Sequence, residues 1–339
     1  MKILIIKLRY IGDTLTLLPL VKAIKKNQPE AKVFLLVYKG TEGILRYQKE
    51  IDGILLLDRK EIKESHLFKK IIYGLKTWIS TYKNRFDVVI DLTSSDRSAF
   101  ISLMSGAKIR IGAPLGNFLE RIAYHNLIEG DTKSTHVIDY QMYSLKFLGF
   151  SIPEPDTTIF VPEEINEKLM TKWSGLINTR PLVVIHPGAR KRHRQWREER
   201  FAYIADRIKT AYNSQIVLIG GPGEEGILEK VEANMVFKPE AKFNSLELIE
   251  VAALLKHAQL FIGNDTATGH IAAGVGTPHI ILFGPTFPQL WAPKGGKGIY
   301  IFKSPECCGC PQISCFKKDN PCMDWIKVED VWQAVEKML

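Results

Sequence analysis

The stretch AQLFIGNDTATGHIAAGVGTPHIILFGPT, residues 258–286, contains the pattern that decides the fold. An apolar run at 258–265 precedes a stretch rich in Gly and Ala at 266–274, and a second apolar run follows at 279–285. Short apolar runs of this kind are typical of buried parallel strands, and the segment between them is long enough for a helix. The stretch therefore predicts one β–α–β unit, whose polar residues fall where the first strand ends and the helix begins.

The same alternation extends along the rest of the chain. Buried strands are predicted in two series, at 2–8, 32–37, 53–58, 87–93 and 107–113, and at 182–188, 215–221, 258–265 and 279–285. Helices are predicted at 14–27, 67–82, 138–148, 197–212, 223–233, 245–256 and 266–274. The Pro-marked stretch 151–164 separates the two series. The pattern predicts an α/β protein with two Rossmann-like domains, at 1–160 and 170–325, whose parallel sheets face each other across a cleft.

The composition is that of an ordinary globular protein. Of the 339 residues, 45% are hydrophobic and 24% are charged, which excludes a disordered or fibrous chain. No stretch approaches the roughly 18–20 apolar residues of a membrane helix. The first residues have only five apolar side chains before Lys7, so a signal peptide is not expected. We expect a cytoplasmic protein, or one bound peripherally to a membrane.

The net charge of +9 is confined to the first half of the sequence. Residues 1–150 have 24 basic and 15 acidic side chains, whereas residues 151–339 have 22 of each. An anionic partner is therefore expected on the first half, unless the bias serves only solubility. The expected helix at 67–82 combines Trp78 with several lysines, so it would either rest on an anionic membrane or simply cover the sheet. A nucleic-acid partner is not expected, because no aromatic residues interleave the basic runs.

A carboxylate follows the first predicted strand. In the sequence RYIGDTLTLLP, Gly12 would allow a tight turn from strand to helix, and Asp13 would stand where ligands of such sheets bind. There the Asp13 carboxylate would act as a general base, or it would only cap the helix that follows.

Two further strand ends have polar loops. The strand ending at His186 leads into Gly188 and then into ARKRHR, where four fixed cations before a helix favour binding of a diphosphate, with a solvated basic loop as the alternative. The turn GGPGEEG, residues 220–226, matches a dinucleotide fingerprint, but it belongs to the second β–α unit of its half. Its carboxylates, Glu224 and Glu225, would repel a pyrophosphate and suit ribose hydroxyls. A nicotinamide-dependent oxidoreductase is the alternative function.

The segment that follows the strand at 258–265 has the highest density of polar residues. Exposed backbone amides at 266–269 would hold phosphate oxygens, and Asp265 would accept hydrogen bonds from sugar hydroxyls. His270 is equally consistent with a catalytic role and with a core histidine.

All five cysteines lie within sixteen residues of the tail. Their spacing, C-C-x-C-x₄-C-x₆-C, supplies enough thiolates for a Zn²⁺ or iron–sulfur site, although it lacks paired C-x₂-C motifs. Disulfides or free thiols are the alternatives, and a structural role is expected in each case. The cysteines are Cys307, Cys308, Cys310, Cys315 and Cys322.

Taken together, these segments resemble glycosyltransferase family 9, the ADP-heptose:lipopolysaccharide heptosyltransferases. The resemblance rests on IGDTLTLLP, VIHPGARKRHRQW, the GG-x-x-E turn, FIGNDTATGHIAAGVGTPHIILFGPT and the tail CCGC…C…PCMDWI. DLTSSDRSAF and RYIGD look most like the heptosyltransferase III branch. The resemblance implies a GT-B fold and an inverting, metal-independent transfer of heptose from ADP-heptose to the lipopolysaccharide inner core or a lipid A precursor. It also implies an enzyme at the inner leaflet of the inner membrane, with no cofactor required. Another nucleotide-sugar-dependent transferase of the same fold is the alternative.

The resemblance also assigns residues to roles. Asp13 falls on the general base, and Arg194 stands where relatives have a phosphate-binding Lys. Glu224, or equally Glu225, falls on the contact to ribose. The donor set implied is Gly188, Lys191, Arg194, Glu224, Glu225, Asp265, Thr266, Ala267, Gly269 and His270. The acceptor side comprises Arg9, Gly12, Asp96 and Arg97, and the helix at 326–339 is expected to pack back on the N-terminal domain.

Overall fold

The computed structural model describes residues 1–59, 61, 79, 81–176, 180–304, 306–310, 315 and 321–339. Most of the expected helix at 67–82, including Trp78, lies outside these residues. The chain forms two compact units, Met1–Asp156 and Thr157–Leu339, and the boundary between them lies inside the Pro-marked stretch 151–164.

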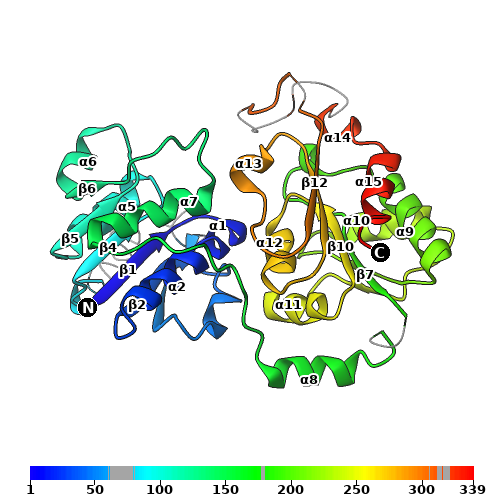
Figure 1. Ribbon diagram of the computed structural model, residues 1–339, viewed down its shortest axis with the longest axis horizontal. Helices are drawn as coiled ribbons and strands as arrows, with labels where there is room; N and C mark the ends of the chain where they lie inside the picture. The colour runs from blue at the N-terminus through cyan, green and yellow to red at the C-terminus, as the bar shows by residue number, and fades with distance from the viewer. Residues whose placement is uncertain are drawn as a thin grey trace. The chain divides into compact units, whose positions relative to one another are not determined.

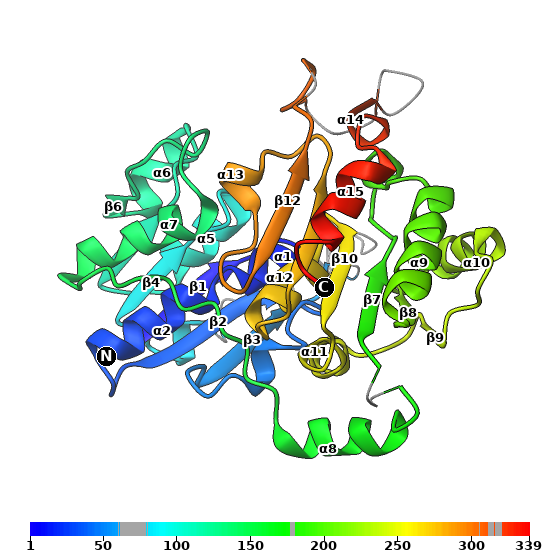
Figure 2. The ribbon, with the colours of Figure 1, turned by 45° about the vertical axis from the view of Figure 1, so that its right-hand side comes forward.

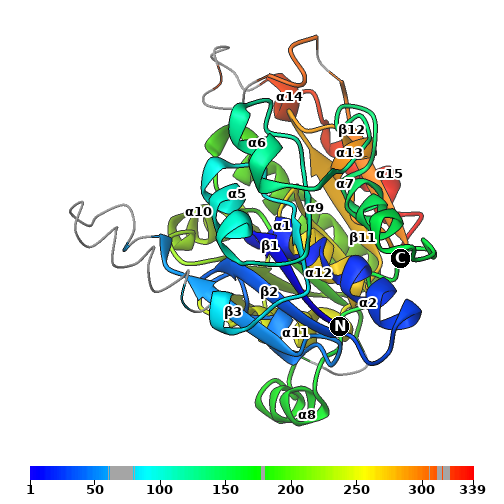
Figure 3. The same ribbon diagram turned by 90° about the vertical axis from the view of Figure 1, so that its left-hand side faces the viewer.

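Unit 1 is built on one six-stranded parallel sheet with the order β3-β2-β1-β4-β5-β6 (Figure 1). Its strands are β1 (Lys2–Lys7), β2 (Lys32–Tyr38), β3 (Gly53–Leu57), β4 (Val88–Asp91), β5 (Ile109–Gly112) and β6 (Asn126–Leu127). Its helices are α1 (Ile11–Leu15), α2 (Leu18–Asn27), α5 (Asp96–Met104), α6 (Phe118–Ala123) and α7 (Val137–Met142), with 3-10 turns η1 (Leu45–Tyr47) and η2 (Tyr143–Leu148). Helices α2 and α7 lie side by side, as do α5 and α6 (Figure 3).

The single helix predicted at 14–27 is wrong in one respect, because two helices occupy this stretch. Helix α1 begins at Ile11, and α2 begins at Leu18. Pro19 lies in the first turn of α2 and has no N–H to donate to the preceding turn, so a continuous helix would lose a hydrogen bond there. As a result, Gly12 and Asp13 lie inside a short helix of their own.

Unit 2 repeats the plan with the order β12-β11-β10-β7-β8-β9. Its strands are β7 (Leu182–His186), β8 (Gln215–Ile219), β9 (Ala241–Phe243), β10 (Leu260–Asn264), β11 (His279–Phe283) and β12 (Gly298–Phe302). Its helices are α8 (Glu163–Lys172), α9 (Glu198–Tyr212), α10 (Glu225–Asn234), α11 (Leu248–Lys256), α12 (Ala267–Gly274), α13 (Pro288–Trp291), α14 (Pro321–Asp324) and α15 (Val328–Val335), with the 3-10 turn η3 (Arg192–Arg194). Every strand pairing in both sheets is parallel, as predicted.

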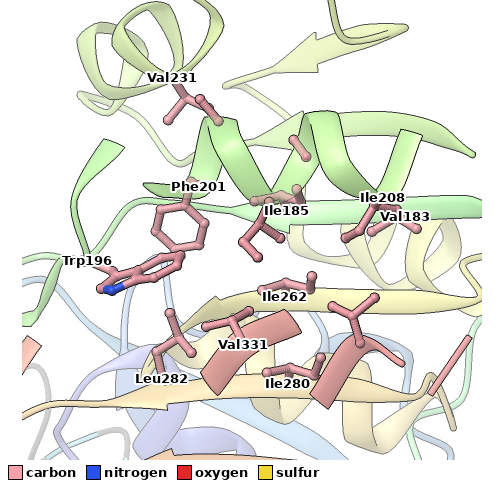
Figure 4. Close-up of a cluster of buried hydrophobic side chains, with 14 of the residues drawn as sticks. Val183, Ile185, Trp196, Phe201, Ile208, Val231, Ile262, Ile280, Leu282 and Val331 are labelled. Atoms are coloured by element: carbon pink, nitrogen blue, oxygen red, sulfur yellow. The ribbon is translucent and has the colours of Figure 1, made fainter. Parts of the chain in front are cut away.

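Alternate residues of the unit 2 strands form a core against α9 and α15. Figure 4 shows Ile185, Ile262 and Leu282 from three neighbouring strands meeting Phe201 of α9 and Val331 of α15. A strand buried on both faces needs apolar side chains at every position, which explains why these strands are continuous apolar runs in the sequence.

The prediction that the C-terminal helix packs on the N-terminal domain is wrong. Helix α15 packs against α9, β11 and β12 within unit 2 (Figure 2). Val331, Trp332 and Val335 recur at helical spacing on one face and are buried in the core of unit 2, which gives the helix its place there. The Arg207 guanidinium of α9 lies 4.0 Å from the centre of the Trp332 ring.

Candidate functional site

Each sheet has a switch point, where the chain reverses the direction in which it adds strands. In unit 1 the switch lies between β1 and β4, and in unit 2 it lies between β7 and β10. Because neighbouring helices leave opposite faces of the sheet there, a crevice forms beyond the carboxyl ends of the strands, and ligands bind in it. The residues predicted for the site follow β1, β4, β7, β8 and β10, so both groups of candidates lie at these strand ends.

In unit 2, three polar side chains from different segments meet at the end of β7. The Nε2 atom of His186 lies 3.0 Å from Oε2 of Glu224, and its Nδ1 atom lies 3.2 Å from the hydroxyl of Thr266. The backbone amide of Gly221 also donates to Oε2 of Glu224, at 2.7 Å. Burial raises the pKa of the Glu224 carboxyl, but the hydrogen bonds and the charge of His186 outweigh it and lower the pKa below its ordinary value.

The structure distinguishes between the two adjacent glutamates. The carboxylate of Glu224 lies against the backbone of Gly188, so closely that a Cβ atom on residue 188 would overlap it. Glu225 is exposed, and its carboxylate accepts a 3.3 Å hydrogen bond from the amide of Gly223 in the same turn. Glu224 is therefore the glutamate that lies at the switch point.

A buried asparagine joins the end of β10 to the segment ARKRHR, residues 189–194, called the basic loop below. The side chain of Asn264 donates to the carbonyl oxygens of Pro187 and Gly188, and it accepts from the backbone amide of Trp196. These bonds hold the chain on both sides of the basic loop. Sequence reasoning did not select Asn264 or His186, although both are polar residues at the end of an apolar strand, which is the signal that could have found them.

The four fixed cations of the basic loop have different surroundings. Arg192 pairs with Glu198 of α9 at 3.1 Å, so it helps to fix the loop in place. Arg194 lies 3.6 Å from the Oδ2 atom of Asp265 across the switch point. Burial raises the pKa of the Asp265 carboxyl, and the charge of Arg194 opposes that shift. Arg190 is exposed and Lys191 is half-buried. The loop is thus partly structural, as well as a source of positive charge at the strand ends.

Helix α12 begins at the same place. Thr266 is its N-cap residue, with Ala267 in the first turn. The first backbone amides of a helix have no acceptor inside it, so they are available to an anion. Gly269 lies against β11, where a Cβ atom would come within 2.8 Å of the Ile281 side chain, so close packing explains this glycine. His270 is half-buried on the same helix.

In unit 1, Asp13 lies in the third position of α1 and is not the N-cap residue. Its carboxylate accepts from the backbone amide of Tyr10, which is the N-cap, at 3.3 Å. Gly12 lies within the same helical turn, and it is not among the glycines with a left-handed backbone. The expected tight turn at Gly12 is therefore wrong, because residues 8–10 make the connection from strand to helix.

A buried lysine lies close to Asp13. The Nζ atom of Lys7 donates to the carbonyl oxygen of Leu92 at 3.0 Å, and the side chain is buried. Burial lowers the pKa of Lys7, while the charges of Asp13 and Asp91 act in the opposite direction. Asp91 is fully buried, and it accepts from the hydroxyl of Tyr124 and the amide of Thr93.

The remaining acceptor candidates lie on the loop after β1 and on α5. Arg9 donates to the carbonyl oxygen of Thr93 through Nε and Nη2, at 3.2 and 2.8 Å. Asp96 begins α5 and accepts from the side chain of Asn117, whereas Arg97 is exposed, with its Nη1 atom 3.5 Å from the hydroxyl of Tyr38. These side chains come from segments adjacent to the switch point of unit 1.

The cysteines of the tail gather beside the basic loop. Among the described residues no cysteine is in a disulfide, and no group of three or more His, Cys, Asp or Glu side chains is arranged to hold a metal ion. Burial raises the pKa of the Cys322 thiol to about 11 and raises that of Cys308 as well. Burial, together with the charges of Lys191 and Arg194, lowers the pKa of His193.

Comparison with known proteins identifies the family. The model of "Glycosyltransferase family 9 (heptosyltransferase)" matches residues 75–320. The chain belongs to glycosyltransferase family 9. This membership confirms the resemblance found in the sequence and rules against the oxidoreductase alternative.

Individual relatives agree with this family. The chain is 29% identical to "Lipopolysaccharide heptosyltransferase 3" of Escherichia coli K12, over 98% of this chain and 96% of that protein. Among solved structures, a family 9 glycosyltransferase from Veillonella parvula has a TM-score of 0.86 at 22% identity, covering 99% of this chain and 96% of that chain. E. coli heptosyltransferase WaaC with ADP-2-deoxy-2-fluoro heptose has a TM-score of 0.76 at 18% identity, covering 99% of each chain. The GT-B fold class is thereby confirmed. No helix in the described parts of this family 9 chain has the length and hydropathy needed to span a bilayer.

Proposed function

We propose that this glycosyltransferase moves heptose from ADP-heptose to a hydroxyl of the lipopolysaccharide inner core or a lipid A precursor, with inversion at the anomeric carbon. The observation that carries the proposal is the chemistry at the two switch points. The switch point of unit 2 presents cations and helix amides suited to a diphosphate, and that of unit 1 presents the Asp13 carboxylate, whose charge acts on the buried Lys7. The names of the relatives, which include lipopolysaccharide heptosyltransferases, support the choice of substrates.

The donor binds to unit 2 in this proposal. The diphosphate takes up the charges of Arg194 and Lys191 and the first amides of α12, at Thr266 and Ala267. The amide of Gly269 already donates to the carbonyl oxygen of Thr266 at 3.2 Å, so Gly269 contributes through its close packing. Arg194 is balanced by Asp265 until the anion arrives, so binding exchanges one partner for another. His270, half-buried on α12, belongs to the same proposed donor site.

Glu224 accepts from the ribose hydroxyls of the donor. Its carboxylate is ionised and is held by His186 and Gly221, so it is already oriented before the nucleotide binds. Gly188 leaves the space that this carboxylate needs. Glu225, exposed and directed into its own turn, has no part in the proposed contact.

The acceptor hydroxyl loses its proton to Asp13. As the proton moves to the carboxylate, the hydroxyl oxygen forms a bond to the anomeric carbon, and the bond from that carbon to the diphosphate oxygen breaks. ADP leaves with the bonding electron pair, and the cations of unit 2 stabilise its charge. Attack opposite to the leaving group inverts the configuration. Every charge is supplied by a protein side chain, so the proposed transfer needs no metal.

Positive charge on the acceptor side fits an anionic glycolipid. Residues 1–150 hold the whole excess of +9, and Arg9 and Arg97 lie near the switch point of unit 1. Gly12 and Asp96 complete the proposed acceptor side. An enzyme of this charge would associate peripherally with the inner leaflet of the inner membrane, where anionic lipids attract basic surfaces.

The proposal is tested by ADP release from ADP-heptose in the presence of a heptose-deficient lipopolysaccharide acceptor. Asp13→Asn should lower kcat by about 10²–10⁴-fold, because general base catalysis is typically worth that much, and should leave the Kd for ADP within about twofold. Asp131→Asn, at an exposed loop of the same unit, is the control and should keep the wild-type rate. If Asp13→Asn turns over at the wild-type rate, the assignment of the base is refuted.

A further inference from the structure

All five cysteines of the chain line one small cavity of about 10 Å³ in unit 2, together with His193 and Pro285. This is about the space that one water-sized particle occupies. The thiols reach it from the 307–310 turn, from residue 315 and from α14, while the histidine comes from η3, more than a hundred residues earlier. Such a convergence of sulfur and imidazole groups is not needed by the proposed transfer.

The histidine is the residue that the known contacts leave unexplained. His193 is only 8% exposed, and its Nε2 atom is buried without a hydrogen-bond partner among the described residues. An unsatisfied buried polar group of this kind destabilises the folded protein. A ligand in the cavity that His193 lines would remove that destabilisation.

Cys322 is the best-placed thiol. It is 6% exposed, and its Sγ atom lies 3.9 Å from the carbonyl oxygen of His193, so the two residues are neighbours. The thiol of Cys308 approaches the carbonyl oxygen of Pro285 at 3.4 Å. The other three cysteines are half-buried around the same space.

We propose that this cavity binds one thiophilic divalent cation, with Zn²⁺ the best match to its donors, through His193, Cys322 and two further cysteines. Imidazole nitrogen and thiolate sulfur are the ligands that Zn²⁺ prefers, and four of them complete a tetrahedral site. Each thiol that binds releases a proton to solvent, and the charge of the ion compensates the thiolates.

In the described part of the chain these side chains line the cavity but do not yet converge on one point as metal ligands do. A cysteine thiol turns about a single torsion, so thiols that line a cavity can converge on an ion without a change of fold. A disulfide between two cysteines is the competing outcome. It would use none of the imidazole chemistry and would leave Nε2 of His193 without a partner.

The bound ion would also restrain a residue of the proposed donor site. His193 directly precedes Arg194 in η3, and Arg194 reaches Asp265. A metal bond to His193 would hold η3 to the cysteine tail and limit the movement of Arg194. This consequence rests on the proposed function, whereas the metal site itself does not.

The test uses the full-length protein, purified without chelators and analysed for metal by mass spectrometry. We expect about one Zn²⁺ per chain. Replacement of that metal with Co²⁺ should give the visible absorption of a tetrahedral centre with thiolate charge transfer. His193→Ala should weaken Co²⁺ binding by at least about 100-fold, since even residues that only orient a metal ligand contribute 10–100-fold. His257→Ala, elsewhere in unit 2, is the matched control and should bind normally.

A second variant keeps the proposal open to refutation if His193→Ala folds poorly. His193→Cys supplies another metal ligand, so it should restore Co²⁺ binding with stronger thiolate absorption, which a merely structural role would not predict. The proposal is overturned if the reduced wild-type protein binds neither Zn²⁺ nor Co²⁺. Full metal binding by His193→Ala, or a disulfide in protein purified without oxygen, would also overturn it. If the wild-type protein binds the metal but does not bind ADP, the proposed donor site is refuted and the metal site is not.

Discussion

Gly188→Ala tests the link between the backbone of the β7 loop and the ribose contact. The new methyl group would overlap the carboxylate of Glu224. That carboxylate is the far end of a flexible side chain, so it would swing away at little steric cost. The loss of binding and stability comes instead from two broken hydrogen bonds, which join Glu224 to His186 and to the amide of Gly221.

The magnitude follows from these contacts. A hydrogen bond to a charged group is worth about 1.5–3 kcal/mol, so loss of the ribose contact should weaken ADP binding by about 10–100-fold. His186 is buried and would lose one partner, which should lower the free energy of unfolding by about 1–2 kcal/mol. Isothermal titration with ADP and urea denaturation measure the two effects.

Two variants sharpen this prediction. Gly221→Ala is the control, because a Cβ atom there would lie 3.6 Å from Oε2 of Glu224, an ordinary van der Waals contact, and ADP binding should be retained. The double variant Gly188→Ala/Glu224→Ala relieves the overlap but still lacks the carboxylate, so it should bind ADP as weakly as Glu224→Ala alone. If Gly188→Ala binds ADP as tightly as the wild type, Glu224 does not contact the nucleotide and the reasoning is refuted.

Further predictions concern charge, pH and the core. Arg194→Ala should weaken ADP binding by about 10–100-fold by calorimetry, and Arg194→Lys should recover only part of it, because a lysine cannot reproduce the bidentate geometry. The folded-state pKa of Glu224 is lowered from 4.5, so its stabilisation is complete above that pH and is lost on acidification through the lower folded-state value. Glu224→Gln should therefore flatten the fall of unfolding free energy with acid in urea titrations. Trp332→Ala should cost about 3–5 kcal/mol in unfolding free energy, while Trp325→Ala, half exposed, should change it by less than about 0.5 kcal/mol.

A specific result would refute each of these three predictions. Unchanged ADP affinity in Arg194→Ala would remove that side chain from the donor site. An identical acid dependence in Glu224→Gln would mean that its carboxylate is not held by His186 in the folded protein. Equal losses of stability in the two tryptophan variants would show that α15 does not complete the core of unit 2.

Local patterns predicted most of the strands, because a strand buried on both faces must be apolar throughout and so is visible in the sequence. The strands that these patterns do not predict are short or lie at a sheet edge. β6 has two residues and β9 has three, and β12 is an edge strand with several half-buried residues. The sequence does not predict helix α8, because it begins within the Pro-marked stretch 151–164 that separates the two series. In these elements the apolar signal is too weak to be separated from a loop.

The amino-acid sequence by itself determined the alternation of strands and helices, the two series and the positions of the polar loops at strand ends. Only the tertiary structure showed that Glu224 lies at the switch point, paired Arg194 with Asp265 and Arg192 with Glu198, and placed α15 within unit 2. It alone also brought His193 to the cysteines. The physical reason is that periodicity is local along the chain. The partner of a given side chain, in contrast, depends on which distant segments the folded sheets bring within a few ångströms of one another.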